Sequence, residues 1–230
     1  MQIHDGKPLF SASDLVGFQE CEHFTTLSLN DLIEKLPRAE DDESLELIQN
    51  KGYAHESGFL ASLKAKGSRI VEIDDGHKPE MLAAHTLAAM REGPDVIFQA
   101  AFLAPPFFGK ADFLRRVERP SKLGAWSYEA IDTKLARTPK AKFVLQLALY
   151  SDLLGSAQGL DPAAMHLVLG DGAEHSFRVA DYSRYVAQVK ERFLGFTGAH
   201  PSPTYPQRNP HCPFCPWRDL CDERWSRTTT

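Results

Sequence analysis

Apolar residues recur every three or four positions in much of the chain, whereas the middle, residues 96–135, carries strand-like apolar runs. Since an α-helix repeats every 3.6 residues and a strand every two, the first pattern predicts helices and the second predicts strands. The predicted helices run through Leu15–Cys21 after a Ser11 or Ser13 cap, and over 26–35, 45–66, 79–92, 139–155 and 182–196. The predicted strands are 70–73, 96–103, 107–117, 126–135, 165–169 and 176–179. This order of elements predicts an α/β fold.

The bulk properties are those of an ordinary globular protein. The chain has 230 residues, of which 43% are hydrophobic, which is enough for one sizeable α/β domain with or without a small added module. It has no apolar run that would span a bilayer, and its polar start does not look like a secretory signal. We therefore expect a cytoplasmic protein with no membrane partner, whose four cysteines favour a metal site over disulfides.

The charge is unevenly distributed. A net charge of −5 argues against a protein that coats nucleic acid by charge alone. Residues 107–142, however, contain nine basic residues against four acidic ones. The basic ones are Lys110, Arg115, Arg116, Arg119, Lys122, Lys134, Arg137, Lys140 and Lys142. A solvated face and a nucleic-acid contact surface explain this stretch equally well until the motifs inside it are considered.

One motif in the basic stretch suggests metal chemistry. Side chains two apart in a strand face the same way, so Asp132 and Lys134 are expected on one side and Glu129 on the other. Asp112 is expected on the neighbouring strand. Two carboxylates side by side raise each other's pKa, and a divalent cation such as Mg²⁺ or Mn²⁺ removes that cost. Such a cation with a nearby ammonium suits phosphodiester hydrolysis.

Each of these residues also has a structural interpretation. An Asp-x-Lys triplet is common by chance on an exposed strand face, although a Gly109-x-x-Asp112 sequence about twenty residues earlier favours the metal site. Gln146 and Tyr150 lie one helical turn apart, either in the core or against a substrate backbone. His55 is either a packed histidine or a metal ligand.

Taken in order, these motifs resemble the RecB-type branch of the PD-(D/E)XK nuclease superfamily over nearly the whole chain. The resemblance implies a restriction-endonuclease-like core, with a mixed central sheet flanked by helices. It implies that His55, Asp112, Asp132 and the Thr133 carbonyl bind the metal and that Lys134 acts in catalysis. The expected DNA contacts are Gln146, Tyr150, Arg116 and Arg137. The Pro-Asp pair of the superfamily is Ala111-Asp112 here.

The cysteines form a separate pattern, with Cys21 near the start and Cys212-x2-Cys215-x5-Cys221 near the end. On spacing alone, zinc and an iron–sulfur cluster are equally suitable, and buried free thiols are a third interpretation. The layout resembles that of RecB-like iron–sulfur nucleases, including AddB-type and CRISPR-associated relatives. This implies a [4Fe–4S] cluster that joins the two ends of the chain, with His23 and His211 as the alternative ligands in a mixed set.

These expectations combine into one hypothesis. Residues 1–50 form a helical segment with the first cysteine, 51–200 form the nuclease core, and 201–230 form the cysteine segment. The expected activity is that of a Mg²⁺- or Mn²⁺-dependent deoxyribonuclease acting on single-stranded ends or flaps, with a helicase domain or subunit as partner. One alternative is a non-catalytic nucleic-acid-binding module of the same fold. Another is a zinc-stapled scaffold, which leaves the basic stretch unexplained.

Overall fold

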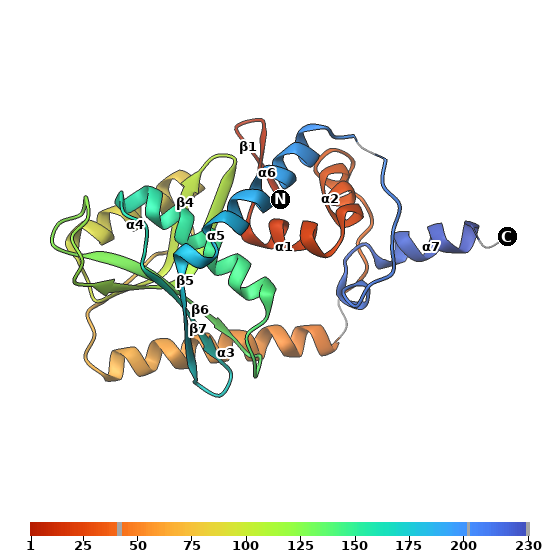
Figure 1. Ribbon diagram of the computed structural model, residues 1–230. Helices are drawn as coiled ribbons and strands as arrows, with labels where there is room; N and C mark the ends of the chain where they lie inside the picture. The colour runs from red at the N-terminus through yellow and green to blue at the C-terminus, as the bar shows by residue number, and fades with distance from the viewer. Residues whose placement is uncertain (41–42, 202, 229–230) are drawn as a thin grey trace. The chain divides into compact units, whose positions relative to one another are not determined.

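The computed structural model describes residues 1–40, 43–201 and 203–228 (Figure 1). The chain divides into two compact units, one made of residues 1–49 and 187–230 and the other of residues 50–186. Helices α3 (Glu43–Ala65) and α6 (Ser183–Gly198) each contain one boundary between the units. None of the described helices is long and apolar enough to cross a membrane.

The unit of residues 50–186 is built on a six-stranded sheet with the order β3-β4-β5-β6-β7-β8. Its strands are β3 (Ile70–Glu72), β4 (Val96–Ala104), β5 (Phe107–Val117), β6 (Ser127–Lys134), β7 (Ala164–Leu169) and β8 (Glu174–Arg178). The β3–β4 and β6–β7 pairs are parallel, and the other three pairs are antiparallel. The expected mixed sheet of an α/β fold is therefore confirmed.

Helices cover both faces of this sheet. On one face, Leu60 of α3 packs in a buried cluster with Phe113 of β5 and Ile131 of β6. On the other face, α5 (Ala141–Gln158) packs against β6, where Gln146 contacts Asp132, the neighbour of Ile131. Consecutive strand residues point to opposite faces, so Ile131 fills the core while Asp132 faces α5. Helix α4 (Pro79–Glu92) packs against β4.

The unit of residues 1–49 and 187–230 is mainly helical. Helix α1 (Ala12–Glu20) starts at Ser11, which forms a capping box with Asp14, and helix α2 (Glu22–Glu34) follows it. Helix α7 (Arg218–Thr228) lies near the end of the chain. Phe10 and Phe18 both make edge contacts with Phe193 of α6.

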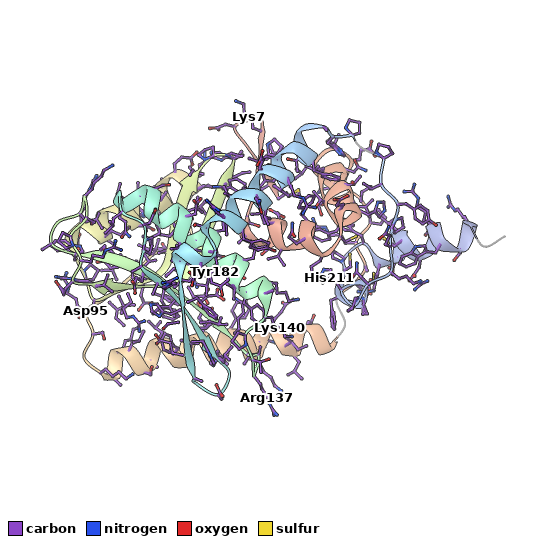
Figure 2. All side chains as sticks on the ribbon, in the orientation of Figure 1. Lys7, Asp95, Arg137, Lys140, Tyr182 and His211 are labelled. Carbon is purple, nitrogen blue, oxygen red and sulfur yellow. The ribbon has the colours of Figure 1, made fainter. Side chains whose placement is uncertain are left out.

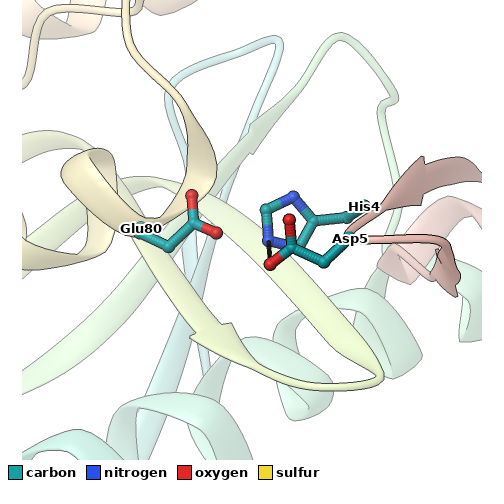
Figure 3. Close-up of side chains that lie close together, drawn as sticks. All are labelled: His4, Asp5 and Glu80. Atoms are coloured by element: carbon teal, nitrogen blue, oxygen red, sulfur yellow. Dashed lines mark ion pairs between the residues drawn. The ribbon is translucent and has the colours of Figure 1, made fainter.

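A two-stranded hairpin, β1 (Gln2–His4) and β2 (Lys7–Leu9), opens this unit. At its turn, His4 Nε2 lies 3.6 Å from an Asp5 carboxylate oxygen (Figure 3). Glu80, which the same figure draws, belongs to α4 in the other unit, so no site is assigned to the three residues.

The main differences from the predicted elements fall outside the sheet. Cys21, expected at the end of the first helix, has an extended backbone (φ −164°, ψ 113°) and separates α1 from α2. The hairpin and α7 are not predicted from the pattern at all. Helix α5 runs past the predicted end at Gly155 and ends before Gly159, whose φ of 66° suits a helix C-cap.

The buried cluster yields a test of the core. Phe113 is fully buried and packs against the rings of Phe59 and Phe98, each with a centroid distance of 5.0 Å. Phe113→Ala is expected to lower the free energy of unfolding by about 3–5 kcal/mol through lost burial and a residual cavity. Urea unfolding measures this, with exposed Tyr185→Ala as the control. A loss no larger than the control's would contradict this packing.

Candidate metal centre and cysteine cluster

Asp112 lies where the sheet loses regular pairing on both sides. The β4–β5 register runs from Phe98↔Phe113 to Ala100↔Ala111 and omits the Gln99–Asp112 position between them. The β5–β6 register ends at Phe113↔Ile131, immediately before Asp112. The Asp112 Oδ2 atom instead accepts hydrogen bonds from the Thr133 backbone N–H at 2.8 Å and from its hydroxyl at 2.9 Å. Regular strand pairing is thus absent at Asp112, one of the predicted metal ligands.

Gln99 has an unusual backbone conformation opposite Asp112. Its φ of +57° lies in the left-handed region, which costs a non-glycine residue on the order of 1–3 kcal/mol. Its side-chain amide donates a hydrogen bond to the Glu56 carboxylate of α3. Neither residue is predicted from the sequence, since neither belongs to a recognisable motif.

Asp132 and Lys134 lie on the same side of β6, as the strand period predicts. The Lys134 ammonium is 2.5 Å from Asp132 Oδ2. The Gln146 amide lies 3.4 Å from Asp132 Oδ1 and donates to the Tyr150 hydroxyl at 2.9 Å. Asp132 is fully buried, so its carboxylate depends on these two partners. Glu129 points away, to the Ala164 N–H and His166.

Burial sets the electrostatics of this site. Burial, reinforced by the neighbouring Asp112 carboxylate, raises the pKa of Asp132 to about 7 despite the opposing effect of Lys134. Burial alone would lower the pKa of Lys134, but the Asp132 and Asp112 carboxylates outweigh it and hold that pKa above its ordinary value. The pKa of Glu56 is also raised, by burial and then by Asp112. Asp132 and Glu56 are therefore both held above their ordinary pKa although Lys134 lies close to them.

The donor set fits a divalent cation. His55 Nε2 is buried and has no hydrogen-bond partner, so it is an unpaired nitrogen of the kind that binds such a cation. The ligand atoms of His55, Asp112 and Asp132 do not all lie within 4.8 Å of one another. Each carboxylate is instead bonded to a protein group, Asp112 to Thr133 and Asp132 to Lys134.

The two arginines predicted to contact DNA differ in their surroundings. The Arg116 guanidinium donates to the Gly93 carbonyl at 2.9 Å and lies 4.7 Å from the Trp126 ring centroid, contacts that explain its position without DNA. Arg137 is exposed between β6 and α5, and its side chain points away from the ribbon (Figure 2). This loop is fixed by the Gly170 N–H, which donates to the Ala136 carbonyl at 3.2 Å.

Other members of the basic stretch form internal ion pairs. Lys110 pairs with Asp75 at 2.6 Å, and Arg115 pairs with Glu174 at 2.7 Å. These contacts reduce the positive charge available to an external partner.

The four cysteines gather around one small pocket, in the unit of residues 1–49 and 187–230. The pocket is lined by all four cysteines together with Phe24, Leu27, Pro206, Gln207, Asn209, His211, Trp217, Arg218 and Trp225. Burial, followed by the other three thiols, raises the pKa of Cys221 to about 11. Burial also raises the pKa of Cys215. Four thiols around one pocket, with the pKa values of Cys215 and Cys221 raised, fit a cationic centre, which would stabilise the thiolate forms.

The four thiols are spread more widely than a single ion would hold them. No three of the four sulfur atoms lie within 4.8 Å of one another. A tetrahedral zinc site with Zn–S bonds of about 2.3 Å would place the sulfurs about 3.8 Å apart. Of the two alternative ligands, His211 lines the pocket, whereas His23 does not and its Nδ1 is 2.7 Å from the Thr204 hydroxyl. Trp217 is buried, and its indole N–H donates to the Ser28 hydroxyl, so it is part of the packing around this pocket.

Comparison with known protein families identifies the chain. Residues 21–222 match the family model described as PD-(D/E)XK nuclease superfamily. The chain belongs to the PD-(D/E)XK nuclease superfamily. The match covers the six-stranded sheet, the candidate metal centre and all four cysteines of this PD-(D/E)XK protein.

Two further comparisons add little to this PD-(D/E)XK assignment. The crystal structure of SSO0001 is similar with a TM-score of 0.43 and 14% identity, over 96% of this chain and 89% of that one. A search of curated proteins finds no match.

The raised pKa of Asp132 yields a test of the metal-free PD-(D/E)XK site. The pKa of Asp132 is about 7 in the folded protein and about 3.9 in the unfolded chain. Ionisation of Asp132 therefore lowers the free energy of unfolding progressively as the pH rises from about 4 to about 7, and fully at higher pH. With chelator present, Asp132→Asn is expected to be more stable than wild type by roughly 2–4 kcal/mol at about pH 8, with the difference disappearing towards about pH 4.

Chemical denaturation across this pH range measures the difference, and Asp171→Asn, in an exposed turn, is the matched control. A variant less stable than wild type at about pH 8 would refute the unfavourable burial of the Asp132 charge.

Proposed function

We propose that the protein is a Mg²⁺- or Mn²⁺-dependent deoxyribonuclease of the RecB-like, iron–sulfur-containing type. The observation that carries the proposal is the Asp132 carboxylate, held between Lys134 and Gln146 and raised in pKa by its burial and then by Asp112. A structural role alone does not need two carboxylates and a lysine at this depth.

The cation would be held by His55, Asp112, Asp132 and the Thr133 carbonyl, and when bound it supplies positive charge at the phosphate and a more acidic water. Residues of the chain position the substrate and the attacking water. The Lys134 ammonium, which lies 2.5 Å from Asp132 Oδ2, would donate to a phosphate oxygen or orient the attacking water. Gln146 is fixed by Tyr150, and the two hold the substrate backbone beside Asp132.

The four cysteines are proposed to hold a [4Fe–4S] cluster. The layout of one early and three late cysteines supports this, and so does the gathering of all four around one pocket. Its role is structural, because it would close a loop between Cys21 and Cys212 and reduce the entropy of the unfolded chain, by analogy with a disulfide on the order of 4–5 kcal/mol.

The substrate we propose is single-stranded DNA, at ends or flaps, with a helicase domain or subunit as partner. Support comes from the resemblance to RecB-like nucleases and from exposed Arg137 on the loop that follows Lys134. In this proposal residues 1–50 and 201–230 provide the cysteines, and residues 51–200 carry out cleavage.

A non-catalytic DNA-binding module is the second candidate function. The separation of the His55, Asp112 and Asp132 ligand atoms is the observation that favours it. Complete retention of Asp112, Asp132 and Lys134 argues for catalysis.

A cleavage assay separates the two functions. Anaerobically purified protein is expected to cleave labelled single-stranded DNA with Mn²⁺, and Lys134→Ala is expected to reduce the rate by about 10²–10³-fold by removing charge stabilisation at the phosphate. Asp132→Ala should abolish cleavage with Lys134 still present, and Asp171→Asn should retain the wild-type rate. Folded wild-type protein that binds DNA without cleaving it would establish the non-catalytic function instead.

Metal analysis tests the cysteine cluster independently. Anaerobic preparations are expected to contain about four iron and four sulfide per chain. Cys215→Ser is expected to lose the iron and lower the midpoint of thermal unfolding, because one thiolate ligand is removed. One zinc per chain with no sulfide would contradict the iron–sulfur assignment and leave the nuclease proposal unaffected.

A further inference from the structure

Gln99 departs from the regular strand at a position that affects the candidate metal centre. Among the described residues of the six-stranded sheet, it is the only non-glycine with a positive φ, +57°. It is also the residue that the β4–β5 register omits, directly across from Asp112. Backbone strain of this kind persists where surrounding contacts require it, and it concentrates at functional sites.

The strained backbone of Gln99 changes the direction of its side chain. Phe98, the residue before Gln99, packs against Phe113 on the face of the sheet covered by α3. Regular alternation would send Gln99 to the opposite face. The left-handed backbone instead allows the Gln99 amide to donate its hydrogen bond to Glu56 of α3. Two consecutive side chains of β4 thus contact the α3 side.

Glu56, the acceptor of this hydrogen bond, has the position and the chemistry of a site residue. It follows His55 on α3 and interacts electrostatically with both Asp112 and Lys134. Through its hydrogen bond to Gln99, Glu56 is held next to the strand position directly across from Asp112. A third oxygen donor suits a hard cation such as Mg²⁺ or Mn²⁺, which favours carboxylate ligands.

We propose that Glu56 is a further carboxylate of the metal centre and that Gln99 is the positioning residue that holds it there. This inference rests on the nuclease function proposed above. The Gln99 amide fixes one Glu56 oxygen by hydrogen bonding and leaves the other available to the cation. The strained backbone of Gln99 serves this orientation.

Mn²⁺ binding tests the proposal without DNA or turnover. The amount of free Mn²⁺ in titrations of the anaerobically purified full chain is measured by electron paramagnetic resonance. The variants are Glu56→Gln, Gln99→Gly and Asp132→Asn, with Glu92→Gln as the control because Glu92 is an exposed glutamate of the same unit. Glycine adopts a positive φ without strain, so Gln99→Gly removes the amide and relieves the backbone together.

Glu56→Gln and Gln99→Gly are expected to weaken Mn²⁺ binding by roughly 10–100-fold, with Gln99→Gly at least as resistant to thermal unfolding as wild type. Glu92→Gln should bind like wild type. If Gln99→Gly also binds like wild type, Gln99 is not a positioning residue. If Glu56→Gln binds like wild type while Asp132→Asn does not, the proposal fails and the nuclease function stands. Wild-type protein that binds no Mn²⁺ would overturn both.

Discussion

The burial of the Asp132 carboxylate beside Asp112 is the constraint on which the rest of the site depends. Removing a carboxylate from water is costly, and a second negative charge nearby adds to the cost. The surrounding residues partly offset this cost. Lys134 provides a positive charge and Gln146 a polar contact to Asp132, and the Thr133 N–H donates a hydrogen bond to Asp112. These contacts stabilise the site and involve the same carboxylates that are proposed to hold the cation.

The sheet is arranged around this constraint. Regular antiparallel pairing would occupy the backbone beside Asp112, but both neighbouring ladders are interrupted there. The Thr133 N–H is thereby free to bond the Asp112 carboxylate, and Gln99 is displaced towards α3. On the α3 face, the buried cluster holds the strands together at Phe113 and Ile131, the last regular pair before the interruption. A well-packed core thus supports a locally irregular functional site.

Sequence patterns predict the elements where local signals are strong. The helix Pro79–Glu92 is bounded by Pro79 and by Gly93, whose φ is 69°, and its predicted and observed ends agree. Helix α7 is missed because six of its eleven residues are charged, which hides any apolar face. The relation of Asp132 to Lys134 follows from the strand period. The roles of Gln99 and Glu56 do not, because they depend on a backbone distortion that tertiary contacts impose.

Proton release on metal binding tests the central claim most directly. If Asp132 has a pKa of about 7 and binds the cation as a carboxylate, Mn²⁺ binding at about pH 6 releases about one proton per chain, and at about pH 8.5 nearly none. Calorimetry in buffers of different ionisation enthalpy measures this number. A release that declines across this range would support a buried, cation-dependent carboxylate. Tight Mn²⁺ binding with no proton release at about pH 6 would contradict it.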